Sequence, residues 1–193
     1  MEVRPSLSCC RRRGLPHSWS SDAKYLTINR YGELYILTAD GSGQLQDLAT
    51  SPFPKSSPMF SVDGNWIVYS SNDSGRLEVY VRDVTRSGPR IPVSKNGGTE
   101  PMWSKRGDEI FYRQGARLMS VSVERGSGLA LSESRVLFEG VFAEGQSGIP
   151  NYDVTSDGQE FVMVVQDDSA AVPQINVVVN WDEVLNRLVP TDN

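Results

Sequence analysis

The heptapeptide Ser61-Val62-Asp63-Gly64-Asn65-Trp66-Ile67 places a tight turn directly before an apolar strand. The same order of hydroxyl residue, polar turn and apolar residues recurs elsewhere in the chain. The other copies are SSDAKYL at 20–26, SKRGDEI at 104–110 and TSDGQEF at 155–161, and successive copies begin 41, 43 and 51 residues apart. We infer that the chain uses one structural unit about four times.

Further short strands surround each copy and are separated by glycine-bearing turns. One strand precedes the hydroxyl residue of each copy. Two more strands follow the first three copies, and they are expected at 33–38 and 45–48 in the first, at 78–83 and 90–93 in the second, and at 117–124 and 135–138 in the third. Apolar runs such as WIVY at 66–69 are typical of strands covered on both faces. A repeat of about 40–50 residues made of such strands predicts β-propeller blades, each with four short antiparallel strands.

The Asp-Gly pair in the turn predicts a two-residue hairpin loop in which both central residues have positive φ. Glycine adopts positive φ at no steric cost. Ala23 stands where glycine is expected, and Arg106 stands where aspartate is expected. The copy that begins at Ser20 is therefore the least regular one.

The last unit is predicted to be incomplete. Strands are expected at 151–155, 160–166 and 175–181, and no fourth strand follows. Instead, apolar residues recur with the spacing of one helix face, and Pro190 ends the pattern. We expect a short C-terminal helix that packs on the last blade and is built on Trp181, Val184, Leu185 and Leu188.

The sequence thus predicts an all-β propeller of about four blades. Residues 1–16 are expected to form an unstructured tail, and 17–193 the repeats, with units at about 17–57, 58–100, 101–149 and 150–193. The net charge of the chain is −5. The tail carries four arginines and one glutamate, a charge of +3, so the rest of the chain carries −8. An acidic body argues against nucleic acid as a partner, since phosphate binding requires basic surface.

The N-terminal residues carry no further signal. Adjacent Cys9 and Cys10 cannot build a disulfide framework. The apolar stretch that an export signal needs is missing, and no apolar run is long enough to span a membrane. The sequence alone therefore leaves the compartment open.

The repeats resemble TolB-type β-propellers. The resemblance rests on 58–82, on 101–112 and on INVVVNW at 175–181 before the expected helix, and it covers about 17–190. More narrowly, these segments are similar to the C-terminal propeller of bacterial Ser/Thr protein kinases of the eukaryotic type. The resemblance implies six or more blades and a location outside the cytoplasm. The chain is then either the C-terminal part of a larger propeller or a small propeller closed or completed by a partner.

No catalytic constellation is recognisable. His17 is the only histidine, and its position favours a surface or strand-edge residue. The stretch GQSGI at 145–149 fails the nucleophile-elbow pattern at its last position, and kinase motifs are missing. We expect no metal site and no cofactor, because the acidic loops lack spaced ligand patterns.

The expected function is a non-enzymatic binding, sensor or scaffold module for a protein, peptide or envelope ligand, related to the sensor part of a signalling protein. Loops on a rigid scaffold commonly carry recognition. The candidate contact residues lie in two loops that are expected near the propeller axis, at 73–76 and 144–151, and are Asp73, Ser74, Arg76, Glu144, Gln146 and Asn151. Open blade edges predict self-association. The alternatives are a fragment without independent function and a hydrolase or lyase acting at the propeller mouth.

Overall fold

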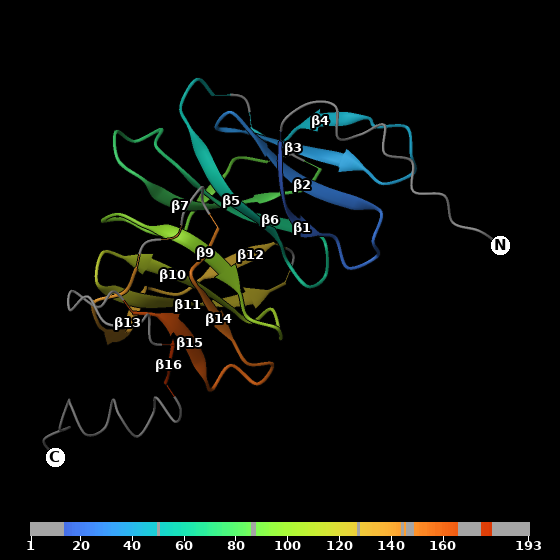
Figure 1. The fold of residues 1–193 in the computed structure, drawn as a ribbon. Helices are drawn as coiled ribbons and strands as arrows, with labels where there is room; N and C mark the ends of the chain where they lie inside the picture. The colour runs from blue at the N-terminus through green and yellow to red at the C-terminus, as the bar shows by residue number, and fades with distance from the viewer. Residues whose placement is uncertain are drawn as a thin grey trace, which may run out of the picture.

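Each copy of the repeat forms its own antiparallel sheet, and the four sheets follow one another around the molecule in chain order (Figure 1). The computed structural model describes residues 14–49, 51–85, 88–126, 128–143, 145 and 149–165, together with the backbone of 175–178. We name the sheets blades 1 to 4. Within blades 1 and 2, strands that follow one another in sequence are also neighbours in the sheet.

The strands of the four blades have the following bounds. Blade 1 contains β1 (Leu15–Trp19), β2 (Tyr25–Arg30), β3 (Glu33–Thr38) and β4 (Leu45–Asp47). Blade 2 contains β5 (Lys55–Phe60), β6 (Trp66–Ser71), β7 (Glu78–Asp83) and β8 (Ile91–Pro92). Blade 3 contains β9 (Thr99–Trp103), β10 (Glu109–Gln114), β11 (Arg117–Arg125), β12 (Leu129–Leu131) and β13 (Arg135–Glu139). Blade 4 contains β14 (Tyr152–Val154), β15 (Phe161–Val164) and β16 (Ile175–Val178).

The all-β class and the four sheets of about four antiparallel strands are confirmed. No helix occurs among the described residues. The helix expected at 181–188 and the tail up to residue 13 lie outside them. Three strands begin earlier than the expected unit boundaries, because Leu15 pairs with Asn29, Lys55 pairs with Ser71 and Thr99 pairs with Arg113.

Blade 3 has one strand more than the repeat predicts. Its strand β11 is 9 residues long, so one edge offers two successive pairing segments. The far end of this edge pairs with β12, through Val123 and Leu131, and the near end pairs with β13, through Leu118 and Phe138. The extra strand β12 therefore follows from the length of β11.

The turn between the first two strands of each blade differs from the predicted two-residue hairpin. In blade 2 the backbone N–H of Ser61 donates to the carbonyl oxygen of Trp66 at 2.8 Å, and four residues lie between them. Only Gly64 among these four has positive φ, at 72°. The Trp66 N–H donates to the Ser61 hydroxyl oxygen at 3.0 Å. The Ser61 hydroxyl thus accepts the N–H that a strand carbonyl would otherwise accept. The hairpin is therefore closed by a four-residue loop in which Gly64 alone has positive φ.

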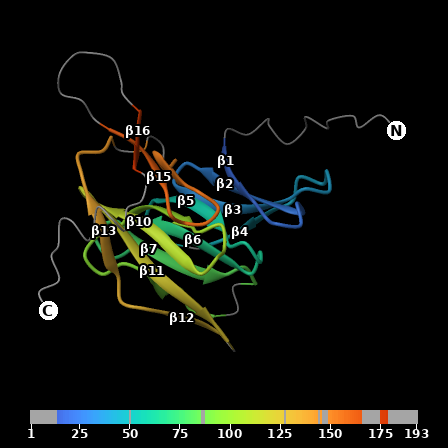
Figure 2. The same ribbon diagram turned by 90° about the horizontal axis from the view of Figure 1, so that it is seen from below.

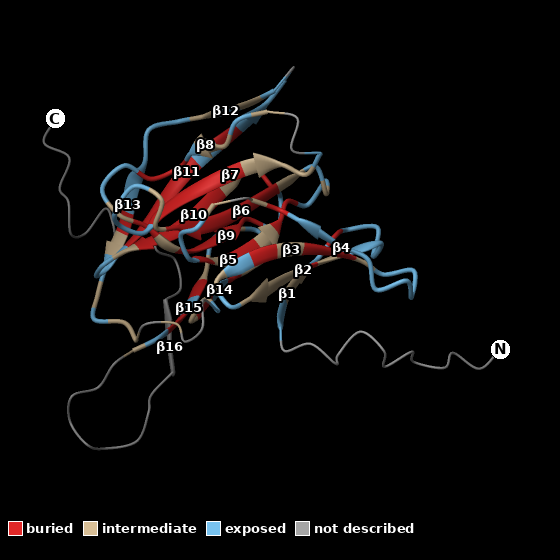
Figure 3. Ribbon diagram, turned by 90° about the horizontal axis from the view of Figure 1, so that it is seen from above, coloured by how far each residue is buried: buried red, intermediate tan, exposed pale blue. Residues whose placement is uncertain are grey.

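Among the described residues, the core consists of three clusters, each between two neighbouring blades, as Figure 3 shows by the buried residues in the middle of the sheets. Alternate residues of β6 serve different clusters. Ile67 and Tyr69 pack toward blade 1, whereas Val68 packs toward blade 3. Figure 2 shows the same succession of blades from below. The expectation that the apolar strands are covered on both faces is confirmed for blades 2 and 3.

Candidate functional site

The first strand of each blade is an edge strand, and these four strands lie toward the middle of the arrangement (Figure 1). We call them the inner strands: β1, β5, β9 and β14. They border a hollow of about 330 Å³, the axial groove. Its lining residues are Pro16, His17, Ser18, Ser57, Pro58, Met59, Pro101, Met102, Lys105, Ile149, Pro150, Tyr152 and Asp153.

The axial groove is built from equivalent positions of the repeat. The hydroxyl residue that begins each turn is Ser20, Ser61, Ser104 or Thr155, and we call it the turn hydroxyl. The residues two positions before it all line the groove: Ser18, Met59, Met102 and Asp153. The preceding positions, His17, Pro58, Pro101 and Tyr152, line it as well. Each blade thus contributes the same two backbone positions, while the side chains differ. Blades 2 and 3 provide an apolar floor of proline and methionine, and blades 1 and 4 provide polar groups.

A β-bulge shapes three of the inner strands, β1, β5 and β9, where they meet the groove. In β5, Ser57 and Pro58 together oppose one residue of β6, and Ser57 has φ 54°. In β9, Glu100 and Pro101 do the same, and Glu100 has φ 52°. A bulge bends its strand and tolerates proline, which cannot donate a ladder hydrogen bond. The bulges therefore redirect these strands beside the groove.

His17 is the residue whose role the sequence could not indicate. It lies on the inner edge strand β1 and is half-buried. Its Nε2 atom is buried and has no hydrogen-bond partner among the described residues. Burial lowers the pKa of His17, so the ring is neutral near neutral pH. The ring can then form a hydrogen bond with a bound group through Nε2, and no described acid or base is paired with it.

The polar side of the groove contains an ion pair between blades 3 and 4. Lys105 Nζ lies 3.5 Å from Asp153 Oδ1, and both side chains are partly exposed. An exposed pair at this distance contributes little to stability, on the order of 0–1 kcal/mol. Both groups can therefore exchange their mutual contact for a contact with a ligand.

One wall of the groove is held by a buried ion pair. Arg113 Nη1 lies 3.4 Å from Glu100 Oε1, and each side chain is about 6% exposed. The same carboxylate accepts the backbone N–H groups of Gly145, at 2.9 Å, and of Asn151, at 3.0 Å. Arg113 also donates to the carbonyl oxygen of Ala143 at 2.6 Å. These bonds fix both ends of the connection between blades 3 and 4.

Tyr152 completes this wall. Its hydroxyl donates to the carbonyl oxygen of Glu100 at 2.7 Å. Burial raises the pKa of Tyr152 well above its ordinary value, so the ring stays neutral and keeps this bond. Ile149 and Pro150 are thereby positioned at the edge of the groove.

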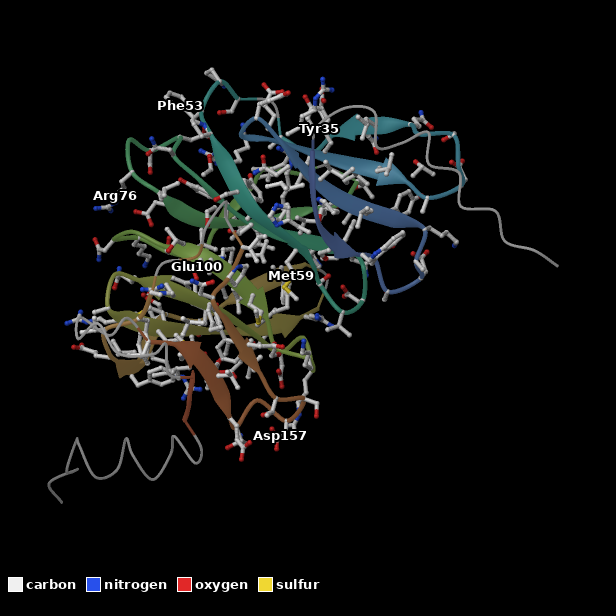
Figure 4. The ribbon with its side chains drawn as sticks, in the orientation of Figure 1. Tyr35, Phe53, Met59, Arg76, Glu100 and Asp157 are labelled. Carbon is white, nitrogen blue, oxygen red and sulfur yellow. The ribbon has the colours of Figure 1, made fainter. Side chains whose placement is uncertain are left out.

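The loop residues nominated from the sequence are not all brought together. Asp73 accepts hydrogen bonds from Ser51 and Arg90, and Arg76 donates to Glu78 and to the carbonyl oxygen of Lys95. These residues hold the periphery of blade 2, where Figure 4 shows Arg76 far from Met59.

The other nominated residues divide between the same loop and the groove. The Ser74 hydroxyl donates to the carbonyl oxygen of Arg76 at 3.1 Å, so it also stays within blade 2. Asn151 adjoins the axial groove through its neighbours Pro150 and Tyr152. Glu144 and Gln146 lie outside the described residues. A contact role for any of the nominated residues stays a prediction.

A second hollow, of about 610 Å³, lies at the end of the blades that carries the Ser-Asp-Gly turns. It includes Asp63, Trp66 and Arg125, and Arg125 Nη1 lies 3.5 Å from Asp63 Oδ2. This hollow draws on blades 1 to 3, whereas the axial groove draws on all four. We therefore regard the axial groove as the candidate functional site.

Within the described ranges, no three histidine, cysteine, aspartate or glutamate side chains gather in a way that could hold a metal ion. The described part of the chain also contains no helix long and apolar enough to cross a membrane.

Comparison with known proteins agrees with the blade architecture. The chain is 36% identical over 85 residues to the Tol-Pal system protein TolB of Francisella tularensis subsp. mediasiatica, a match that spans 42% of this chain. Its structure superposes on putative TolB from Agrobacterium tumefaciens with a TM-score of 0.61 and 20% identity, over 78% of this chain and 57% of that one. The fold is a TolB-like β-propeller.

Other solved structures share this TolB-like fold. TolB from Acinetobacter baumannii gives a TM-score of 0.61 at 19% identity, over 88% of this chain and 42% of that one. The tricorn protease gives 0.58 at 10% identity, over 84% of this chain and 15% of that one. No family model matches the sequence. The chain spans about 20% of the length of the curated relatives that it matches.

Proposed function

We propose that this TolB-like propeller is a non-enzymatic protein-binding module whose axial groove takes an extended segment of a protein or peptide. The observation that carries the proposal is the convergence of equivalent positions from four blades on one groove. Rigid strands position its lining residues. Positioned side chains of this kind lower the entropy lost on binding.

The chemistry of the groove supports a peptide rather than a small charged ligand. Met59 is half-buried and Met102 is buried in the core between blades 3 and 4, and methionine side chains adapt to different apolar partners. His17 offers one hydrogen-bonding atom, and Lys105 and Asp153 offer one charge of each sign. Such a mixture fits an apolar side chain flanked by polar backbone groups.

A sensor role in a signalling protein is a finer form of the same proposal. It is supported by the resemblance of 58–82 and 101–112 to the propellers of bacterial Ser/Thr protein kinases. In that form the axial groove would take the signal, and a separate domain would respond to it.

A displayed library of random peptides, panned against the immobilised chain, tests the proposal. We expect enriched peptides with an apolar residue beside a charged one. Met59→Glu should weaken their binding at least tenfold, because a charge then occupies the apolar floor. Val136→Glu is the matched control: Val136 is half-exposed on the outer strand β13, away from the groove.

Two results would contradict the proposal. The first is a library that yields no enriched peptide although circular dichroism shows a folded chain. The second is an equal loss of binding in the Met59 and Val136 variants, since a groove ligand distinguishes these positions.

A further inference from the structure

The two faces of each blade follow a positional rule. The residue before the turn hydroxyl always points toward the preceding blade. At this position Phe60 packs with blade 1, Trp103 packs with blade 2, and Val154 packs with blade 3. All three are buried. The repeat thus defines a leading face of each blade, which the preceding blade covers.

Blade 1 has the same leading face, but no described blade lies in front of it. The equivalent residue is Trp19, which is 56% exposed. Trp19 pairs with Leu26, Leu26 with Leu37, and Leu37 with Leu45. Paired residues lie on one side of a sheet, so these four form an apolar row across all four strands. We call this row, together with Ile28, the leading face of blade 1.

The exposure of this face is unusual for its residue types. Tryptophan is highly buried on average, and large exposed apolar patches commonly mark interaction sites. Leu45, at the other end of the row, is also 38% exposed, whereas Leu37 between them is 7% exposed, so the exposed apolar surface lies at the two ends of the row. Figure 3 shows the contrast between blade 1, where pale and tan residues dominate β1 and β2, and the buried strands of blades 2 and 3.

The opposite end of the arrangement carries the complementary face. In β6 and β10, the residues that follow the leading-face positions, Val68 and Phe111, are buried by the next blade. Their equivalent in β15 is Val162, and Val164 lies on the same side. Both valines are 39% exposed. We call this pair the trailing face of blade 4.

We propose that the leading face of blade 1 binds the trailing face of blade 4 of a second copy of this chain. Leading and trailing faces meet at three interfaces inside the chain, so the intermolecular contact would continue the same interface. Each copy has one free face of each kind among its described residues. Such a contact is heterologous, joining different surfaces of the two copies.

The oligomeric state of the full chain tests this proposal. Sedimentation of the wild-type chain should show species of at least two copies of 21.3 kDa at tens of micromolar, with the mass falling on dilution. Trp19→Arg and Val164→Lys should each weaken self-association at least tenfold, because each places a charge in the contact. Tyr31→Arg is the control: Tyr31 is 79% exposed in a turn of blade 1, off the sheet face.

Mixing the two variants gives the decisive readout. Trp19→Arg retains its trailing face, and Val164→Lys retains its leading face. An equimolar mixture should therefore form complexes of two copies, although neither variant associates with itself. Circular dichroism of each variant confirms that it is folded.

Three outcomes would overturn the proposal. One is a wild-type chain that stays a monomer up to about 100 µM. Another is association that is unchanged in both variants or not restored by mixing. The third is an immunoblot of source cells showing a much larger polypeptide, because the leading face would then be covered by another part of the same chain.

Discussion

Trp19 of blade 1 and Trp103 of blade 3 occupy the same position of the repeat, directly before the turn hydroxyl. Trp103 is 1% exposed, whereas Trp19 is 56% exposed. The two blades have the same strand order over their first three strands and the same turn hydroxyl. They differ in the blade that precedes them. Blade 2 packs against Trp103, whereas no described blade packs against Trp19.

This difference separates two requirements for burial. A residue must lie on the correct face of a strand, and a second sheet must lie against that face. The repeat provides the first requirement in every blade. The second depends on the position of a blade in the series, so the same residue type contributes very different amounts to stability.

The largest expected effect comes from truncating the two tryptophans. Trp103→Ala should lower the free energy of unfolding by about 3–5 kcal/mol, because it removes a fully buried ring and leaves a cavity. Trp19→Ala should lower it by about 0.5 kcal/mol at submicromolar concentration, where the chain is monomeric. Urea unfolding followed by circular dichroism measures both. Equal losses would show that Trp19 is covered within a single chain.

A smaller effect is expected from substitutions at the turn residue that has positive φ, which is Ala23 in blade 1 and Gly158 in blade 4. Ala23 has φ 55°, which an L side chain adopts at a cost, whereas Gly158 has φ 79° at no such cost. Ala23→Gly should therefore raise the free energy of unfolding by about 1 kcal/mol. Gly158→Ala should lower it by a similar amount, and a Cβ there would meet no atom within 4 Å.

Thermal unfolding of the two turn variants provides the measurement. Opposite shifts of similar size would confirm that backbone conformation alone distinguishes the two turns. A loss of stability in Ala23→Gly would contradict this explanation, since glycine removes no contact that the turn hydrogen bonds require.

The smallest effect concerns the turn aspartates at low pH. The Ser20 hydroxyl and the Lys24 backbone N–H donate to Asp22, and these bonds lower its pKa from 3.8 to about 2. The Thr155 hydroxyl likewise lowers the pKa of Asp157. The unfolded chain then binds more protons than the folded chain between pH 4 and 2. This contribution to stability is therefore complete above about pH 4 and is lost as pH falls toward 2.

Urea midpoints between pH 5 and 2.5 measure this loss. Ser20→Ala should reduce the dependence of the urea midpoint on pH, because Asp22 loses its main hydrogen-bond donor and the pKa of Asp22 returns toward its ordinary value. Asp157→Asn should reduce the corresponding part for blade 4. An unchanged slope in both variants would mean that these turns do not contribute to the acid sensitivity.

Several features of the fold were accessible from the sequence because they depend on neighbouring residues. The apolar runs of β6 and β15 and the spacing of the turn hydroxyls are local patterns, and they were sufficient for the four sheets. The turn type was wrong, because the Ser61 hydroxyl accepts the Trp66 N–H. Composition at an Asp-Gly pair does not reveal that bond.

The candidate site was only partly accessible. The loops around Asp73 and Asn151 were chosen as loops near the propeller axis, but Asp73 and Arg76 make contacts within blade 2. The repeat could have identified the groove, since Ser18, Met59, Met102 and Asp153 recur at one position. What it could not show is that this position faces the middle of the arrangement in every blade.

Local sequence was therefore sufficient for the strands, the positions of the turns between them and the face on which each apolar residue lies, because strand periodicity and turn residues act over a few residues. Contacts between distant segments set the rest. The buried pair of Glu100 and Arg113, the half-buried ring of His17 and the exposure of Trp19 all depend on how one blade lies against the next. Burial and electrostatics are properties of that packing, and no short stretch of the chain contains them.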